Sequence, residues 1–225
     1  MGDMQWLSSQ LDRLRDGARD YGERGWRIAP AHYVCAPGRH RRAGRHRPPG
    51  EVCSCRDTRC TRPGAHPLSP TWAADATYDP SLIAHLWYGP QPWNVLLPTG
   101  DLFDVWQAPL DVASRALDEL RAARRAIGPV AYTPLGEWML FTRARLGAPP
   151  LRLPDGLPLT YHGPGSYVLA PPSQLAGASI RWWRPPSPIA PRLPRWEPIV
   201  EALQRAARSR HVPEAHDIVP VPRAG

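Results

Sequence analysis

The chain has 225 residues, 42% hydrophobic and 21% charged, which is enough to bury the core of one sizeable domain or two small ones. Proline and glycine, at 30 and 18 residues, exceed their average usage, so they argue against a long helical bundle and for short elements joined by many loops. The formal net charge is +8 and every basic residue is an arginine, which favours an anionic partner such as nucleic acid.

The chain opens without the basic start and apolar core of a signal peptide, and no apolar run is long enough to span a membrane. We therefore expect a cytoplasmic protein, with association with the nucleoid left open, and no membrane partner. In that reducing compartment the four cysteines are expected to be thiols or metal ligands rather than disulfides.

The first 87 residues predict two helices and one strand. Apolar residues at helical spacing predict an amphipathic helix over residues 8–24. Residues 26–28 read as a short strand that Pro30 closes. Asp79 is a typical N-cap before a first-turn proline, so a short helix is expected from there through Trp87.

The middle of the chain predicts two strands followed by a helix. Residues 94–97 form a short apolar strand, and a Thr-Gly-Asp turn at 99–101 follows. Residues 102–106 then give a second strand, in what reads as a hairpin with the first. Apolar residues at helical spacing predict a helix from 110 to about 125.

The remaining elements complete a mixed order of helices and strands. Residues 130–133 and 138–142 read as strands paired across a turn at 134–136, and residues 167–170 as a later strand. A last helix is expected over 196–208. This order predicts an α+β fold with a largely antiparallel sheet.

The domain prediction is a single unit over residues 1–210, followed by a flexible tail at 211–225. An insertion at about 35–67 carries the cysteines and almost no apolar periodicity.

Within that insertion, three thiols and an imidazole lie at the compact spacing Cys53-x-Cys55-x4-Cys60-x5-His66. Three thiolates and one imidazole complete a tetrahedral shell for structural zinc, and a bound metal would stabilise a segment that has no core of its own. The alternative is a set of scattered buried cysteines beside a chance histidine. Substitute ligands are also available, namely Cys35, His40 and His46.

Two groups of arginines are candidates for nucleic-acid contact. The first is a run just before the cysteines, which is either a phosphate-contacting arm or a solvated loop; it consists of Arg39, Arg41, Arg42, Arg45 and Arg47. The second is Arg181 and Arg184, which flank two adjacent tryptophans that could stack bases. Adjacent tryptophans more often pack one inward and one outward.

Three segments together resemble the N-terminal domain of bifunctional DNA primase/polymerases. The first is the cysteine cluster closing on Pro-Gly-Ala-His-Pro at 63–67, the second is Asn-Val-Leu-Leu-Pro-Thr-Gly at 94–100, and the third is Gly-Ser-Tyr-Val-Leu-Ala-Pro-Pro-Ser at 165–173. The resemblance spans roughly residues 6–183. It implies the fold of the archaeo-eukaryotic primase superfamily, a two-part α+β catalytic core.

The resemblance also implies a catalytic site that this chain has largely lost. The family holds two metal ions, Mg²⁺ or Mn²⁺, with carboxylates that align a primer hydroxyl with a nucleotide. Asp104 is the one carboxylate that matches a family position. The other positions are occupied by Trp106, Trp138 and Thr160. Nearby groups that could substitute are Asp101, Glu137, Asp155 and His162.

These observations lead to three hypotheses, and whether the chain is an enzyme stays open among them. The first is a primase/polymerase-like domain for DNA replication or repair that binds single-stranded DNA or RNA with lost or reduced nucleotidyl transfer. The second is a working polymerase with a rearranged metal site, which would bind nucleotides and Mg²⁺ or Mn²⁺. The third is a regulatory domain that binds a partner protein. The chain carries no helicase motif, so unwinding would need a separate protein.

Overall fold

The computed structural model describes residues 2–35, 52–148, 153–187 and 193–209. The helices are α1 (Gly2–Glu23), α2 (Trp72–Asp75), α3 (Pro80–Trp87), α4 (Leu110–Ala122) and α5 (Trp196–Arg208). The strands are β1 (Ala29–Ala31), β2 (Val34–Cys35), β3 (Val52–Cys53), β4 (Asn94–Pro98), β5 (Phe103–Pro109), β6 (Val130–Tyr132), β7 (Glu137–Arg143), β8 (Thr160–His162), β9 (Tyr167–Leu169), β10 (Gln174–Leu175), β11 (Ala178–Ser179) and β12 (Arg181–Arg184).

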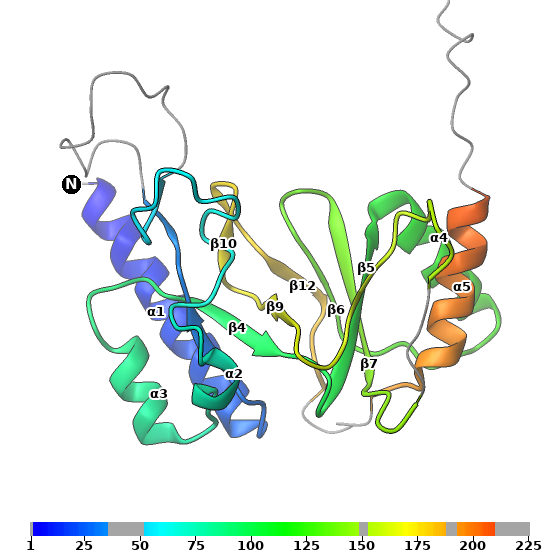
Figure 1. Ribbon diagram of the computed structural model, residues 1–225, viewed down its shortest axis with the longest axis horizontal. Helices are drawn as coiled ribbons and strands as arrows, with labels where there is room; N and C mark the ends of the chain where they lie inside the picture. The colour runs from blue at the N-terminus through cyan, green and yellow to red at the C-terminus, as the bar shows by residue number, and fades with distance from the viewer. Residues whose placement is uncertain (1, 36–51, 149–152, 188–192, 210–225) are drawn as a thin grey trace, which may run out of the picture.

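The elements form two halves that lie side by side in Figure 1. One half holds α1, α2, α3 and a three-stranded sheet in the order β1-β4-β9. The other half is a five-stranded sheet in the order β12-β6-β7-β5-β8, with α4 and α5 against one of its faces. Two further strand pairs, β2-β3 and β10-β11, complete the fold. All of these pairings are antiparallel, which confirms the expected α+β class.

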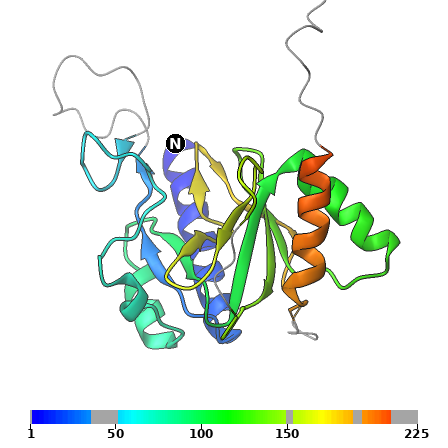
Figure 2. The same ribbon diagram turned by 45° about the vertical axis from the view of Figure 1, so that its right-hand side comes forward.

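The five-stranded sheet separates two hydrophobic cores. One face packs against α1 and the smaller sheet, where Trp26, Phe103 and Phe141 gather with ring centroids 4.8–6.0 Å apart. The other face packs against α4 and α5, which Figure 2 shows side by side. Because successive side chains of a strand point to opposite faces, a one-residue shift along β5 moves a side chain from one core to the other.

Several predicted elements are confirmed, in part because their ends carry specific caps. The side chain of Asp79 accepts hydrogen bonds from the backbone of Ser81 and Leu82, at 2.8 and 3.0 Å, and so begins α3. The last helix has the predicted bounds. The hairpin of β6 and β7 also forms as expected.

Two predictions about strands are wrong. The first strand lies at residues 29–31 and not at 26–28, and Pro30 lies inside it opposite Val95. A proline is tolerated there because β1 is an edge strand and its missing N–H removes no ladder bond to a second neighbour. The strands on either side of the Thr-Gly turn do not form a hairpin, since β4 and β5 belong to different sheets.

The turn after β4 explains why the chain changes sheets. The hydroxyl of Thr99 donates to the carbonyl of Gly163 at 2.7 Å, and its backbone N–H donates to Ser166. Gly100 has a φ of +102°, and a Cβ there would collide with Pro164. The Thr-Gly pair therefore binds the loop between β8 and β9 instead of reversing the chain.

No helix among the described residues is long and apolar enough to cross a membrane.

Candidate metal centre and cleft

The three thiols and the imidazole predicted as metal ligands come together in the structure. The ligand atoms of Cys53, Cys55, Cys60 and His66 all lie within 4.8 Å of one another. Nε2 of His66 is 3.3 Å from Sγ of Cys53 and 3.5 Å from Sγ of Cys60. A tetrahedral zinc with usual bond lengths places such N and S atoms roughly 3.5 Å apart, so the group fits a metal ion of that kind.

His66 is oriented for ligation by a contact on the other side of its ring. Nδ1 lies 3.2 Å from the carbonyl oxygen of Pro67, to which it can donate a hydrogen bond. That tautomer leaves Nε2 without a proton and directed at the thiols. The backbone N–H of Gly64 also points at Sγ of Cys53, at 3.3 Å, and would stabilise a thiolate. The arrangement is typical of a closed structural site.

Asn94 fixes the segment that carries the Cys₃His group, residues 53–66 and here called the metal-ligand segment, to the rest of the fold. Its side chain is fully buried, and its amide nitrogen lies 2.9–3.0 Å from the carbonyl oxygens of His32, Gly64 and Gln174. Its side-chain oxygen accepts the backbone N–H of Gln174 at 2.8 Å. Asn94 therefore ties β4 to the metal-ligand segment and to the segment that follows β9.

Residues of the third motif, at 165–173, also make hydrogen bonds that hold the fold together. The hydroxyl of Ser173 is buried and accepts the backbone N–H of Val95 at 2.8 Å. The buried hydroxyl of Tyr21 in α1 donates to the carbonyl of Pro171 at 2.6 Å. These contacts join the motif at 165–173 to both β4 and α1.

Of the substitute ligands, only Cys35 lies among the described residues. Cys35 is buried on β2, and its thiol does not join the ligand group. Burial and the neighbouring Cys53 raise the pKa of the Cys35 thiol. His40, His46 and the arginine run at 39–47 lie outside the described residues, as does the predicted tail at 211–225.

Beside the metal-ligand segment, a small cleft of about 120 Å³ opens between the two sheets. Arg62 comes from the metal-ligand segment, and its guanidinium carbon lies 5.3 Å from the ring centre of Tyr167 on β9. From the larger sheet, the cleft is lined by Gln107, Glu137, Met139 and His162. Of the described carboxylates, Glu137 alone lines it.

His162 is held neutral in that cleft. Its Nε2 lies 3.0 Å from Oε1 of Gln107, and its Nδ1 lies 3.2 Å from the hydroxyl of Ser166. Burial, together with the charge of Arg62, lowers the pKa of His162 to about 4. At neutral pH the ring is therefore an uncharged hydrogen-bonding group and not a cation for phosphate.

Asp104 lies on the opposite side of the sheet from the cleft. Its side chain is fully buried, and Oδ2 accepts the hydroxyl of Tyr161 at 2.8 Å and the backbone N–H of Arg145 at 2.9 Å. Its other carboxylate oxygen has no hydrogen-bond partner among the described residues. Burial raises the pKa of Asp104, against the lowering effect of the Tyr161 hydrogen bond.

Trp106 and Trp138, the two tryptophans that the sequence resemblance aligned with catalytic positions, share the helix-covered face of the sheet with Asp104. Trp106 is fully buried, stacks on Tyr161 at 4.5 Å and donates its indole N–H to Thr142 at 3.2 Å. Trp138 packs against the second core. Neither tryptophan lines the cleft. The next residue on each strand does: Gln107 follows Trp106 on β5, and Met139 follows Trp138 on β7.

Of the nearby groups proposed as substitutes, the structure brings Glu137 and His162 to the cleft. Asp101 is exposed and lies 3.8 Å from Arg27 in an ion pair. Asp155 is exposed, and Thr160 is exposed on β8 opposite Gln107. Sequence reasoning missed Arg62, Gln107 and Met139. Assigning the other face of β5 and β7 to the cleft would have found Gln107 and Met139, since successive side chains of a strand alternate between its two faces.

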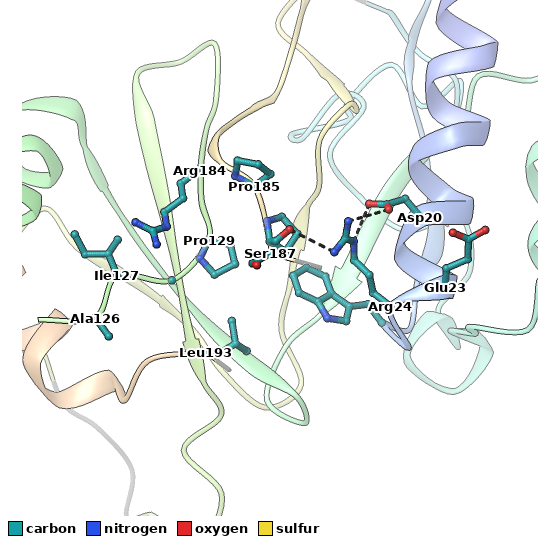
Figure 3. A pocket seen from close by; sticks show the side chains of 13 residues that line it. Asp20, Glu23, Arg24, Ala126, Ile127, Pro129, Arg184, Pro185, Ser187 and Leu193 are labelled. Atoms are coloured by element: carbon teal, nitrogen blue, oxygen red, sulfur yellow. Dashed lines mark hydrogen bonds and ion pairs between the residues drawn. The ribbon is translucent and has the colours of Figure 1, made fainter. Parts of the chain in front are cut away.

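Figure 3 shows a second cavity, of about 680 Å³, between the end of α1 and the segment after β12. Arg24 crosses it and joins the halves, because it pairs with Asp20 at 2.8 Å and donates to the carbonyl of Pro186 at 3.3 Å. Arg184 points into it from β12, toward Ile127.

A family model described as bifunctional DNA primase/polymerase, N-terminal, matches residues 18–196. A search of curated proteins finds no match.

Proposed function

Since that model covers well over half of its length, the chain belongs to the bifunctional DNA primase/polymerase N-terminal family, and we propose that it is a nucleic-acid-binding member with lost or greatly reduced nucleotidyl transfer. It acts on single-stranded DNA or RNA in replication or repair. A cytoplasmic location and a separate helicase or regulatory partner belong to the same proposal.

The observation that carries this proposal is the chemistry of the cleft. The strands of the larger sheet present an amide, a thioether, a neutral imidazole and a single carboxylate to it, from Gln107, Met139, His162 and Glu137. Nucleotidyl transfer in this family needs carboxylates that hold two metal ions. Asp104, the carboxylate at the matching sequence position, is buried under the helical layer with a raised pKa, which favours a structural role.

The donors of the cleft do not fit a pair of Mg²⁺ or Mn²⁺ ions. Such ions prefer several oxygen ligands, and a two-metal site needs more than one carboxylate. Among the described residues, the Cys₃His group is the single cluster of three or more potential metal-binding side chains. We therefore derive no catalytic step through metal ions in the cleft.

The metal of the Cys₃His group is proposed to be structural zinc. Three thiolates and one imidazole are the ligands that zinc prefers, and no ligand position is left open for substrate. Bound there, the metal would hold residues 53–66 against β4 and would place Arg62 at the cleft.

A second candidate function is a polymerase with a rearranged site, which one observation favours. Glu137 lies on β7, the strand next to the one that carries Gln107, and it lines the cleft. One carboxylate is therefore present in the cleft. Primer extension and de novo priming on a single-stranded template, with Mg²⁺ or Mn²⁺, separate the two functions. We expect no product from a folded protein, while a labelled single-stranded oligonucleotide still binds and is released as salt rises.

Paired variants make that experiment decisive. Product that disappears in Glu137→Gln but persists in Asp104→Asn would assign transfer to the cleft and overturn the proposed loss of activity. Product that disappears in Asp104→Asn with an unchanged melting temperature would restore the catalytic role of Asp104. Absence of salt-sensitive binding in the unmodified protein would favour the partner-binding hypothesis instead.

A further inference from the structure

The edge strand β12 carries two adjacent tryptophans that point to opposite sides of the larger sheet. The ring centre of Trp182 lies 5.3 Å from that of Phe141, in the first core. Trp183 points to the other side and is 41% exposed, which is unusual for so large an apolar side chain. Trp182 thus packs β12 against the first core, and Trp183 is left at the surface.

Trp183 is the exposed end of a row of three aromatic side chains, of which the other two are half-buried. Its ring centre lies 5.5 Å from that of Trp138 on β7, which lies 5.9 Å from Tyr132 on β6. The last two rings are nearly parallel, with an interplanar angle of 28°. We call Tyr132, Trp138 and Trp183 the aromatic platform. None of the three lines the cleft, so the platform is a separate surface.

Positive charge surrounds the platform. The guanidinium carbon of Arg121 on α4 lies 4.8 Å from the ring centre of Trp183, and Asp118 compensates its charge at 2.8 Å. Arg181 and Arg184 are exposed at the two ends of β12, and neither forms an ion pair within the described part of the chain. The edge therefore carries two uncompensated cations that are about 10 Å apart along the strand.

We infer that the aromatic platform binds a single-stranded nucleic acid, with a base stacked at Trp183 and phosphates at Arg181 and Arg184. An exposed aromatic ring between arginines, here Trp183 backed by the half-buried rings of Trp138 and Tyr132, is a combination that suits single strands, because every base offers an apolar face and every phosphate a charge. This inference rests on the proposed nucleic-acid binding and names a surface for it outside the cleft.

A second copy of this chain is a poorer occupant. An edge strand can pair with another edge strand, but antiparallel pairing of β12 with its own copy would bring Arg181 and Arg184 of one chain against those of the other. Like charges facing each other across a strand pair are destabilising. An anionic strand meets the same arginines with attraction.

The test is fluorescence anisotropy of a labelled oligothymidine with the full chain. Trp183→Ala should weaken binding by roughly fivefold to a hundredfold, the usual effect of losing one stacked base, and Trp183→Phe should restore part of it. The matched control is Tyr88→Ala, because Tyr88 is 52% exposed with Arg15 at 5.6 Å from its ring centre, yet lies on the other half of the molecule. The affinity of Tyr88→Ala for the oligothymidine should equal that of the unmodified protein.

Two surface variants keep the inference testable if Trp183→Ala fails to fold. Arg181→Gln and Arg184→Gln remove exposed charges, and each should lower the slope of log affinity against log salt by about 0.7, the value for one phosphate contact of a single strand. Unchanged affinity and slope in these variants, with binding by the unmodified protein intact, would overturn the platform and leave the proposed function standing. No binding by the unmodified protein would overturn both. A dimer that Trp183→Ala dissociates, with affinity for the oligonucleotide unchanged, would assign the surface to a second copy.

Discussion

The metal-ligand segment and the cleft are neighbours in space but differ in how their side chains are assembled. The metal group needs four residues within a stretch of 14, Cys53 to His66, so local spacing fixes its chemistry. The cleft is built from β5, β7 and β8 and the metal-ligand segment, which are far apart in the chain. A complete ligand set therefore survives beside a cleft with one carboxylate. The comparison teaches that ligands set by local spacing come together in the fold, whereas side chains brought from distant strands give a cleft with a single carboxylate among the described residues.

The largest effect is expected at the metal group. Cys60→Ser removes a ligand from a segment with little core of its own, so we expect loss of the metal and a fall in the free energy of unfolding of several kcal/mol. Metal analysis of the purified protein and thermal unfolding with and without a chelator measure this. Cys35→Ser is the matched control, since that buried thiol lies outside the group. A metal-free protein that melts like the loaded one would contradict a structural metal.

An intermediate effect is expected where the two regions meet, at Asn94. Asn94→Ala removes the side-chain donor shared by the carbonyl groups of His32, Gly64 and Gln174, which costs about 1–3 kcal/mol for each group left unsatisfied. We expect a loss of stability of about 3 kcal/mol and faster hydrogen exchange in the metal-ligand segment. Gln91→Ala, which removes an exposed partner of Tyr33, is the control and should have little effect. Equal stability of both variants would mean that the metal alone holds the segment.

The smallest effect is expected in the cleft, at His162. Its pKa in the folded protein, about 4, lies below the ordinary value of 6.5. Between these values the unfolded chain binds a proton that the folded chain does not, so the contribution of His162 is complete above pH 6.5 and is lost as the pH falls toward 4. His162→Gln should flatten that part of the pH dependence of urea unfolding. His85→Gln, which removes an exposed histidine, is the control; an identical acid profile in His162→Gln would assign the dependence to another group.

Local signals accounted for much of the fold. The cap at Asp79, the amphipathic period of α5 and the turn between β6 and β7 each depend on residues that are close in the chain. The strand at 29–31 was misplaced because proline is tolerated at an edge, and the sequence does not tell which strand lies at an edge. The false hairpin has a similar cause, since the contact of Gly100 with Pro164 is made across 64 residues.

By itself, then, the sequence determined the Cys₃His group that could hold a metal ion, the basic character and the family, because each depends on residue type and short spacing. Only the tertiary structure decided which side chains meet in the cleft, because a shift of one residue on β5 or β7 exchanges the cleft for the helix-covered core. It also decided that Trp182 is packed while Trp183 is exposed, since adjacent residues of a strand face opposite sides and packing alone selects between them.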